Sequence, residues 1–419
     1  RKHVFYTAAP LRDPDNLRGL AAAAGLTGAT FDSWDAALDR MVEAAAGERM
    51  VLALDEFPSL VSASRGLPGV VQRWWDHRGS RSRLFVILSG SLIGFMTRKV
   101  LAHGAPLFGR RTGSIRLGPL EPWDVRGFLP DAGVRDLWIA HGIFGGVPAY
   151  LERAASARGW RRILAAEAFS QGGFLLDEVP FLLDAELREP STYLSILMAL
   201  ASGSTRQAEI ADRCRVDASS VNRYLSILLE MGIVERRTSL MDPSPEKSRK
   251  GLYSIADPFV RFWCAFVLPA RSVIQAGHGA RHLEARVLPS IPAFLGRSFE
   301  DACRRWVEVR WPAGGRPYAL RVGSVWRKER DGSQTELDVA ASLSDGSLLL
   351  GECKATERPA GPAVLRALEE KASRLPAPAG KTIRLVVFSL SGFHPALSDL
   401  AAGRDDVTLV GGSDVYDPA

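Results

Sequence analysis

The sequence has few cysteines and no long apolar run. These two features argue against a disulfide-rich or zinc-binding protein and against a membrane-spanning one. The four cysteines, Cys214, Cys264, Cys303 and Cys353, are scattered, without the paired spacing of a zinc site or a disulfide framework. No uncharged apolar stretch approaches the ~20 residues that cross a bilayer. The first ten residues, RKHVFYTAAP, lack the apolar core of a secretory signal. We therefore expect reduced thiols, no membrane association and a cytoplasmic protein.

Length and composition indicate an ordinary folded protein of several domains. The 419 residues suit two or three domains, and 46% hydrophobic with 24% charged residues argues against disorder. The net charge of +6 permits a polyanionic partner. A surplus of arginine also follows from GC-rich coding, so the charge alone does not assign nucleic-acid binding.

The N-terminal third alternates short apolar strands with helices. The pattern predicts strands at 3–8, 50–54 and 84–88, and helices at 31–46 and 67–77. Such alternation is typical of a parallel sheet covered by helices on both faces.

An acidic pair, Asp55-Glu56, directly follows one of these strands in the stretch VLALDEFPSL (51–60). The carboxyl ends of parallel strands face the ligand crevice of open α/β sheets. In a nucleotide hydrolase the first carboxylate binds the magnesium complex and the second orients the attacking water. The alternative, equally weighted, is that the pair caps the next helix.

Two further segments favour the nucleotide interpretation. LSGSLIGFM (88–96) places the hydroxyls of Ser89 and Ser91 at a second strand end, where they could lie beside a terminal phosphate. LFGRRTGSIRLGPLEPWD (107–124) supplies Arg110 and Arg111.

Taken together, residues 48–152 resemble the archaeal-type ATPase family of AAA-related P-loop NTPases. The DEFPSL segment matches the Walker B strand and the Gly-Ser strand end matches the sensor, and LFGRRT…PL and GGVPAYL follow in the family's order. The resemblance implies ATP and Mg²⁺ as cofactors. It implies these roles: Asp55 on the magnesium and nucleotide, Glu56 as catalytic base, and Ser89, Ser91, Arg110 and Arg111 as nucleotide contacts, with either arginine acting within the chain or on a neighbouring subunit.

One motif of that family is absent. The phosphate-binding loop GxxxxGK[ST], whose amides and lysine hold the β- and γ-phosphates, occurs nowhere in the sequence. Since RKHVFYTAAP resembles the family's second strand, the first strand and the loop either precede Arg1 or have been lost. We expect this chain to hydrolyse ATP slowly or not at all.

Residues 204–263 have the pattern of a winged helix-turn-helix. A short helix at 206–213, a turn and a second helix at 219–231 are followed by Gly232 as a C-cap and by two segments suited to a hairpin. In DNA-binding versions the second helix enters the major groove and the wing contacts the backbone. The candidate DNA contacts are Ser219, Ser220, Asn222, Arg223, Lys247, Arg249 and Lys250.

Protein contact is the alternative for this module, because winged helices also serve as interaction domains. DNA is the partner that the basic surface favours. A protein partner or a homo-oligomer through the winged helix stays open.

The C-terminal region carries a D…ExK pattern. Asp338 lies in TELDVA, and Glu352 and Lys354 lie on the next strand, in LLGECKA, where residues two apart share a face. A hairpin turn can bring Asp338 beside them, and Glu300 from the preceding helix could add a carboxylate. Carboxylates with one lysine suit magnesium-dependent phosphodiester hydrolysis. The alternative is a solvent-facing strand of alternating charge.

The order of FE (299–300), VGSVW, TELDVA and LLGECKA resembles the PD-(D/E)XK nuclease-like domain found at the C-terminus of the same ATPases. The resemblance implies that Asp338, Glu352 and Lys354 are catalytic, and that Glu300, Asp338 and Glu352 are metal ligands.

Four domains follow from these patterns. We expect an α/β ATPase core at 1–128 that lacks its first strand and P-loop, a helical lid at 129–189, a winged helix-turn-helix at 190–268 and an α/β nuclease-like domain at 285–419, with connecting sequence at 269–287. The expected function is a DNA-directed ATPase fused to a magnesium-dependent nuclease-like domain, in which the ATP state controls DNA engagement or cleavage. The alternative is a non-cleaving, nucleotide-switched DNA-binding or scaffold protein.

Overall fold

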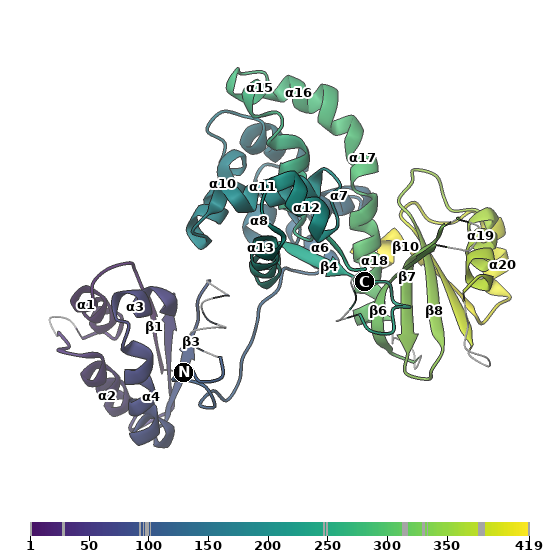
Figure 1. Cartoon of the computed structure of the whole chain (residues 1–419). Coiled ribbons are helices and arrows are strands. Elements are labelled where there is room, and N and C mark those ends of the chain that lie inside the picture. Colours follow the sequence, from purple (N-terminus) through teal and green to yellow (C-terminus); the bar gives the residue numbers. More distant parts are fainter. Residues whose placement is uncertain are drawn as a thin grey trace. The chain divides into compact units, whose positions relative to one another are not determined.

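The chain folds into two units, Arg1–Leu117 and Gly118–Ala419, each described by itself below (Figure 1). The structure is a computed structural model. It describes residues 2–26, 30–91, 94, 96, 100, 102–245, 248, 250–311, 317–328, 332, 334–375 and 382–417. None of the described helices combines the length and the apolar character that crossing a bilayer requires.

Unit 1 contains a three-stranded parallel sheet in the order β1-β2-β3. The strands are β1 (Lys2–Thr7), β2 (Met50–Asp55) and β3 (Leu84–Leu88), and all three predicted strands are confirmed. The helices are α1 (Asp13–Ala23), α2 (Trp34–Ala44), α3 (Phe57–Ala63) and α4 (Leu67–His77), followed by the short η1 (Gly79–Arg81).

Only one face of this sheet is covered in the described part of the chain. Leu52 and Leu54 are buried in one core with the apolar faces of all four helices. On the opposite face Phe5, Phe85 and Ile87 are 58%, 51% and 42% exposed. The prediction of a sheet covered on both faces is therefore wrong for the described residues, because the four helices contribute to a single core.

The helical part of unit 2 begins with a helical subdomain and a winged helix. The helical subdomain contains η3 (Pro122–Asp124), α6 (Val125–Phe128), α7 (Val134–Phe144), α8 (Pro148–Ser156), α9 (Trp160–Ile163), the π-helical η4 (Leu164–Ala168) and α10 (Phe174–Glu186). The winged helix contains α11 (Pro190–Ala201), α12 (Gln207–Cys214), α13 (Ala218–Met231) and the antiparallel pair β4 (Val234–Arg237) and β5 (Leu252–Ile255).

The winged-helix elements match the prediction closely. Gly232 adopts φ 76° and ends α13, as expected of a C-cap glycine. The two predicted hairpin strands pair in antiparallel register, with Val234 opposite Ile255.

The segment 269–287 is helical, so the prediction of connecting sequence there is wrong. The elements that follow the winged helix are α14 (Pro258–Phe262), η5 (Trp263–Val267), α15 (Arg271–Gln275), α16 (Gly279–His282), η6 (Leu283–Val287), η7 (Leu288–Ser290) and α17 (Ile291–Phe294). Each is too short to show a clear period in the sequence. Ile274, Leu283 and Val287 are nevertheless fully buried, so tertiary packing rather than helix propensity stabilises these turns.

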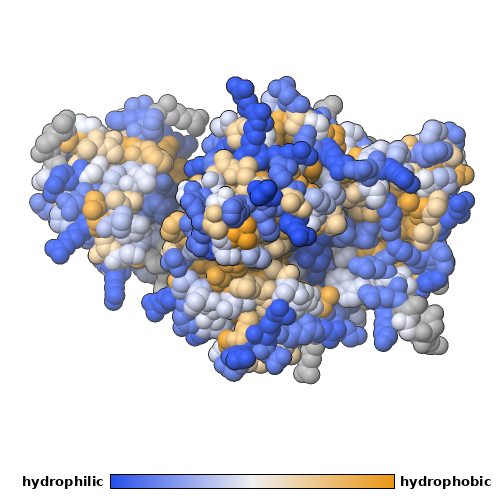
Figure 2. Space-filling model, turned by 90° about the horizontal axis from the view of Figure 1, so that it is seen from above, coloured by the Kyte–Doolittle hydropathy of each residue, from blue (hydrophilic) through white to orange (hydrophobic). Residues whose placement is uncertain are grey.

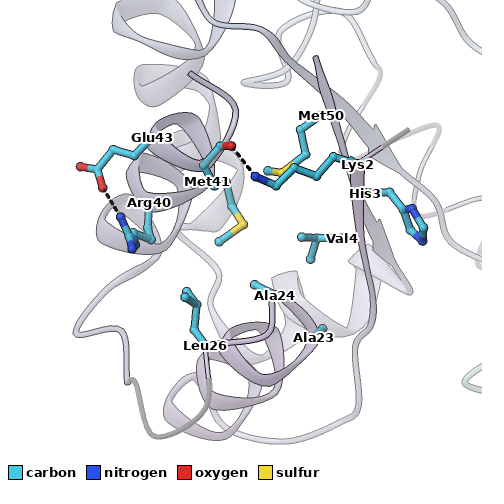
Figure 3. Close-up of a pocket in the computed structure, with 11 residues that line it drawn as sticks. Lys2, His3, Val4, Ala23, Ala24, Leu26, Arg40, Met41, Glu43 and Met50 are labelled. Atoms are coloured by element: carbon cyan, nitrogen blue, oxygen red, sulfur yellow. Dashed lines mark hydrogen bonds and ion pairs between the residues drawn. The ribbon is translucent and has the colours of Figure 1, made fainter. Parts of the chain in front are cut away.

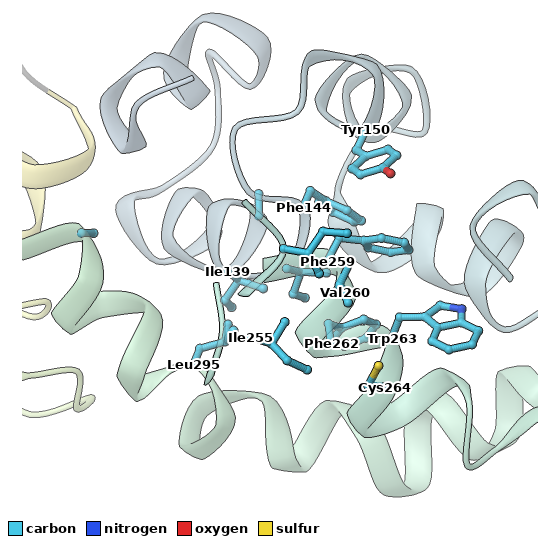
Figure 4. Close-up of a cluster of buried hydrophobic side chains, with 14 of the residues drawn as sticks. Ile139, Phe144, Tyr150, Ile255, Phe259, Val260, Phe262, Trp263, Cys264 and Leu295 are labelled. Atoms are coloured by element: carbon cyan, nitrogen blue, oxygen red, sulfur yellow. The ribbon is translucent and has the colours of Figure 1, made fainter. Parts of the chain in front are cut away.

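An aromatic cluster joins these turns to the helical subdomain (Figure 4). The rings of Phe259 and Tyr150 lie 4.9 Å apart between centroids, and the buried Trp263 donates from Nε1 to the Leu176 carbonyl at 2.9 Å. Phe144 of α7 and Phe262 of α14 are fully buried in the same core. The helices after the winged helix are therefore part of the main core of unit 2.

The C-terminal part of unit 2 is a five-stranded mixed sheet in the order β10-β9-β8-β7-β6. Strands β6 to β8 are antiparallel neighbours, whereas β8, β9 and β10 run parallel. The elements are α18 (Gly296–Arg310), β6 (Ala319–Lys328), β7 (Gln334–Leu343), β8 (Leu348–Lys354), α19 (Pro362–Ser373), β9 (Ile383–Ser389), α20 (Pro395–Ala402), β10 (Val407–Gly411) and α21 (Gly412–Tyr416). The last strand, β10, pairs in parallel with β9 and forms one edge of the sheet.

On the face of the molecule seen in Figure 2, hydrophilic and hydrophobic residues are intermixed. All four cysteines are free thiols.

A carboxylate on α18 gathers four arginines from three elements of unit 2. Asp301 pairs with Arg304 of its own helix, and its carboxylate lies 3.5, 3.8 and 3.9 Å from Arg261, Arg297 and Arg237. Burial alone would raise the pKa of Asp301, but the four cations outweigh burial and lower the pKa to about 2. This cluster joins the winged-helix hairpin and α14 to the helix that borders the C-terminal sheet.

We expect Asp301→Asn to lower the free energy of unfolding of unit 2 by about 2–3 kcal/mol at pH 7. The loss of a buried partner costs about 3–5 kcal/mol, and the side chain of Asp301 is 37% exposed, which reduces that figure. Urea denaturation followed by circular dichroism measures the change. Asp399→Asn, at an exposed position of α20, is the matched control. A difference between the two variants below about 0.5 kcal/mol would contradict the role given to Asp301.

Candidate functional site

Asp55 ends the central strand of unit 1 between two hydroxyls. Ser89, just after β3, donates from Oγ to Asp55 Oδ1 at 2.7 Å, and Thr7 at the end of β1 lies with Oγ1 3.4 Å from Oδ2. The structure therefore brings together Asp55 and Ser89, two of the predicted nucleotide contacts. Thr7 was not predicted. The feature that could have identified Thr7 is its position at the end of β1, because Thr7 pairs with Asp55 in the parallel register.

Glu56 takes a left-handed backbone conformation, with φ 51° and ψ 43°. That conformation costs a residue other than glycine about 1–2 kcal/mol, and such strain tends to gather at functional sites. The side chain caps no backbone group of α3 and instead accepts a hydrogen bond from Ser91 Oγ at 3.2 Å. The helix-capping alternative is therefore wrong for Glu56.

The hydrogen bonds of Arg110, the first of the two predicted arginine contacts, go to a carboxylate other than Asp55 or Glu56. Arg110 donates from Nε and Nη2 to both carboxylate oxygens of Asp76, each at 2.8 Å. The hydrogen bonds from Arg110 hold the pKa of Asp76 below its usual value. Arg111 is exposed. The nucleotide roles of both arginines stay predictions.

A pocket of about 320 Å³ lies at the opposite, amino ends of β1 and β2 (Figure 3). Lys2 and Met50, the first residues of these strands, contribute to its wall. Its charged groups are already engaged: Lys2 Nζ donates to the Ala44 carbonyl at 2.9 Å, and Arg40 pairs with Glu43 at 2.9 Å. We assign no ligand to this pocket.

The start of α13 is organised by Asp217. Its carboxylate accepts hydrogen bonds from the amides of Ser219 and Ser220 at 3.1 and 3.0 Å. Hydrogen bonds from the Ser219 and Ser220 side chains, and then from the amides, lower the pKa of Asp217 well below its usual range. The Ser219 hydroxyl donates to the same carboxylate. Asn222 is exposed on the next turn. The Ser219 hydroxyl and the two amides are therefore engaged in the N-terminal cap of α13.

Arg223 lies along its own helix. Its Nη2 donates to the Tyr224 hydroxyl at 3.0 Å, and its guanidinium is 4.8 Å from the centre of the Tyr224 ring. Of the predicted wing contacts, Lys250 is exposed, and Lys247 and Arg249 lie outside the described residues.

The first half of the wing is bound to the C-terminal sheet. The Leu240 amide donates to the Ser324 carbonyl at 2.9 Å, and the Trp326 amide donates to Ser239 Oγ at 3.4 Å. The side chain of Leu240 packs against the core around Val325. The wing therefore covers part of the edge strand β6, an arrangement that sequence reasoning missed because it depends on residues more than eighty positions apart.

Glu352 is the centre of the predicted acidic and lysine-bearing site. The residue is 7% exposed and has a lysine on each carboxylate oxygen. Lys354 Nζ lies 2.8 Å from Oε1, and Lys371 Nζ, from α19, lies 2.7 Å from Oε2. The predicted shared face of Glu352 and Lys354 is confirmed. Lys371 was missed, because no sequence spacing relates the last turn of a helix to a strand edge.

Asp338 and Glu300 complete the group. Asp338 Oδ2 accepts the Cys353 amide at 2.8 Å, and burial together with the charge of Glu352 raises the pKa of Asp338. Burial, and then the charge of Asp338, raise the pKa of Glu300 to about 7. Arg304 lies 3.7 Å from Glu300 and donates to the Asp338 carbonyl at 2.6 Å.

These carboxylates do not fit a magnesium ion as they are placed. Within the described ranges, no three His, Cys, Asp or Glu residues are grouped so as to hold a metal ion. Both oxygens of Glu352 are occupied by ammonium groups, and one oxygen of Asp338 by an amide. The metal-ligand roles of Asp55, Glu300, Asp338 and Glu352 stay predictions.

Two family models match parts of unit 2. Residues 190–236, which include α11 to α13, match the model of bacterial regulatory proteins of the arsR family. Residues 263–371 match the model described as archaea bacterial proteins of unknown function. The chain thus carries a helix-turn-helix of the arsR type within a mixed α/β protein.

One curated relative is an uncharacterized protein, MJECL04, of Methanocaldococcus jannaschii. It is 29% identical over 359 residues, which cover 84% of this chain and 77% of the relative.

Two solved structures are similar at a low level. The Walker-type ATPase PABY2304 of Pyrococcus abyssi has a TM-score of 0.47 at 17% identity and covers 63% of this chain and 84% of that chain. Cdc6p of Pyrobaculum aerophilum has a TM-score of 0.27 at 17% identity and covers 66% of this chain and 80% of that chain. At TM-scores this low, neither structure assigns a fold or a function to this chain.

We expect Glu300→Gln to stabilise unit 2 at pH 8 and to leave its stability unchanged at pH 5. Because the pKa of Glu300 is raised to about 7, the folded state binds this proton more tightly, and stability falls as pH rises from about 4.5 to 7. The glutamine variant lacks that loss. Solvent screens a side chain that is 33% exposed, so we expect a gain of about 1 kcal/mol. Denaturant unfolding at both pH values measures it, with the exposed Glu336→Gln as control. An equal effect of Glu300→Gln at both pH values would contradict the raised pKa.

Proposed function

We propose that this chain is a DNA-binding protein in which the winged helix engages duplex DNA, unit 1 is an ATPase-type nucleotide module and the C-terminal sheet is a nuclease-like domain. The observation that carries the proposal is the match of residues 190–236 to arsR-family regulators, which coincides with a complete helix-turn-helix. In this motif the second helix lies in the major groove.

The exposed surface around α13 has the chemistry that DNA requires. Asn222, Arg223 and Ser226 are exposed on α13, and Arg213 and Arg215 are exposed at the end of α12. Arginine and asparagine provide the donors and acceptors used for base edges and phosphates. Arg223 donates a hydrogen bond to the Tyr224 hydroxyl, and its guanidinium lies over the ring of the same residue. Exchanging this hydroxyl for a phosphate would give Arg223 a charged hydrogen-bond partner.

Unit 1 supports the nucleotide part of the proposal. Asp55 and Glu56 stand at the carboxyl end of the central strand, where ligands of parallel sheets bind. Hydroxyls from the neighbouring strand ends hold Asp55 in place, and the strained backbone of Glu56 turns its side chain away from helix capping. ATP with Mg²⁺ is the ligand that we propose for this strand end.

We expect the whole chain to bind duplex DNA with an affinity that falls steeply with added salt, because phosphate contacts release counterions. We also expect Asn222→Ala combined with Arg223→Ala to weaken binding about tenfold or more, since a good base or phosphate contact contributes about 1–3 kcal/mol. Fluorescence anisotropy of a labelled duplex between 50 and 200 mM salt, roughly the range over which such contacts are resolved, measures both effects.

The matched control is Arg281→Ala, which removes a positive charge from the exposed surface of α16, outside the winged helix. The control should bind like the wild type. Binding that is independent of salt, or that is equal in the α13 double variant and the wild type, would leave the winged helix as a protein-contact module.

Phosphodiester cleavage is a second candidate function. The observation that favours it is the convergence of Asp338, Glu352 and Lys354 on the adjacent strands β7 and β8. The alternative that the C-terminal domain binds DNA without cutting is favoured by the lysines that occupy both oxygens of Glu352.

We expect DNA cleavage, assayed without metal and with Mg²⁺ or Mn²⁺, to be lost in both Asp338→Asn and Lys354→Met while DNA binding is retained. Gel electrophoresis of labelled single- and double-stranded substrates measures cleavage. Arg366→Met, on the exposed side of α19, controls for loss of charge. No cleavage by the wild type under any condition, with DNA binding intact, would select the non-cleaving alternative.

A further inference from the structure

We propose that Lys371 is a positioning residue that closes the acidic site of the C-terminal domain against divalent cations by holding Glu352 Oε2. This inference rests on the cleavage candidate above. It explains the mismatch between a residue set that suits a metal ion and a placement that does not hold one.

Two lysines from different elements contact the Glu352 carboxylate. The carboxylate is 7% exposed, and its two oxygens accept from two different ammonium groups at 2.8 and 2.7 Å. Lys354 stands two residues along the same strand, so its position is set by β8 itself. Lys371 reaches the same carboxylate from α19, a separate element. Lys371 is therefore the partner that a helix, rather than the strand itself, brings to Glu352.

The positive charge of Lys371 opposes the binding of a cation at Glu352. A cation that binds Glu352 Oε2 must displace the Lys371 ammonium and then lie beside it, and both the lost ion pair and the repulsion between like charges oppose binding. The side chain of Lys371 is 31% exposed, so its ammonium has a solvated position available when it is displaced. The closure is therefore reversible. A metal ion that binds Glu352 must offset the free energy of the Lys371–Glu352 ion pair, which weakens its binding.

The other carboxylates of the site, Asp338 and Glu300, do not replace Glu352 as a ligand for a cation. One oxygen of Asp338 is held by the Cys353 amide. The nearby Glu300 already lies 3.7 Å from the Arg304 guanidinium. Glu352 is consequently the group whose release determines whether two carboxylates can face a common ion.

Calorimetric titration of Mn²⁺ into the whole, metal-free chain tests the inference without any activity readout. We expect Lys371→Met to bind Mn²⁺ about tenfold more tightly than the wild type, and Lys371→Gln to show the same gain. Arg366→Met removes one positive charge from the same helix and should leave the affinity unchanged. Glu352→Gln should abolish binding, which assigns the heat to this site. Circular dichroism checks that every variant is folded.

The outcomes separate this inference from the candidate function. If the wild type binds Mn²⁺ and both Lys371 variants bind it no more tightly, Lys371 only joins α19 to β8, and the inference is overturned while a metal site stands. If Arg366→Met gains as much as Lys371→Met, the effect is general electrostatics, which also overturns it. If Mn²⁺ binding persists in Glu352→Gln, the ion lies elsewhere and the inference fails. If neither the wild type nor the Lys371 variants bind Mn²⁺, the metal-dependent cleavage candidate fails with it.

Discussion

The organisation of unit 2 depends on helix α18 and the charges along it. Asp301 draws together arginines from the winged-helix hairpin, from α14 and from α18 itself. One residue before it, Glu300 faces the acidic site, and one turn later Arg304 donates to the Asp338 carbonyl. A single helix therefore fixes both the winged helix and the strand that carries Asp338. Because four cations share one central carboxylate, removing Asp301 would leave their positive charges facing one another without that anion.

The two candidate sites show how the partners of a carboxylate decide its chemistry. Asp55 is held by neutral hydroxyls from neighbouring strand ends, which leave its negative charge in place for a cation that a nucleotide would bring. Glu352 is held by two ammonium groups, which neutralise its charge locally. Both residues end or nearly end a buried strand, so the sequence context of the two is similar. Their difference lies in the side chains that the fold brings to them.

The winged helix is constrained more than an isolated module would be. Its hairpin is bound to β6 through Leu240 and Ser239, and it shares the Asp301 cluster through Arg237. The surface left for a partner is therefore the exposed side of α13 and the adjacent end of α12. A winged helix fixed in this way presents α13 from a rigid platform, which would lower the entropic cost of ordering that helix on the DNA proposed as its partner.

The sequence by itself determined the local elements and the residues that each strand presents. Apolar strand patterns predicted β1, β2, β3 and β8, and Gly232 marked the end of α13. The i, i+2 rule placed Glu352 and Lys354 on one face, because strand pleating is a local property. The short helices of 269–287 were not predictable in this way, since their stability comes from burial in a core assembled from distant segments.

Only the tertiary structure decided which groups meet. Thr7 reaches Asp55 through parallel register, Lys371 reaches Glu352 across a helix–sheet interface, and Leu240 reaches Ser324 between the wing and the sheet. It also left Phe5, Phe85 and Ile87 exposed on one face of the first sheet, where an apolar pattern had indicated burial. Hydropathy records how apolar a side chain is. Its neighbours depend on the packing of whole elements, which no spacing along the chain encodes.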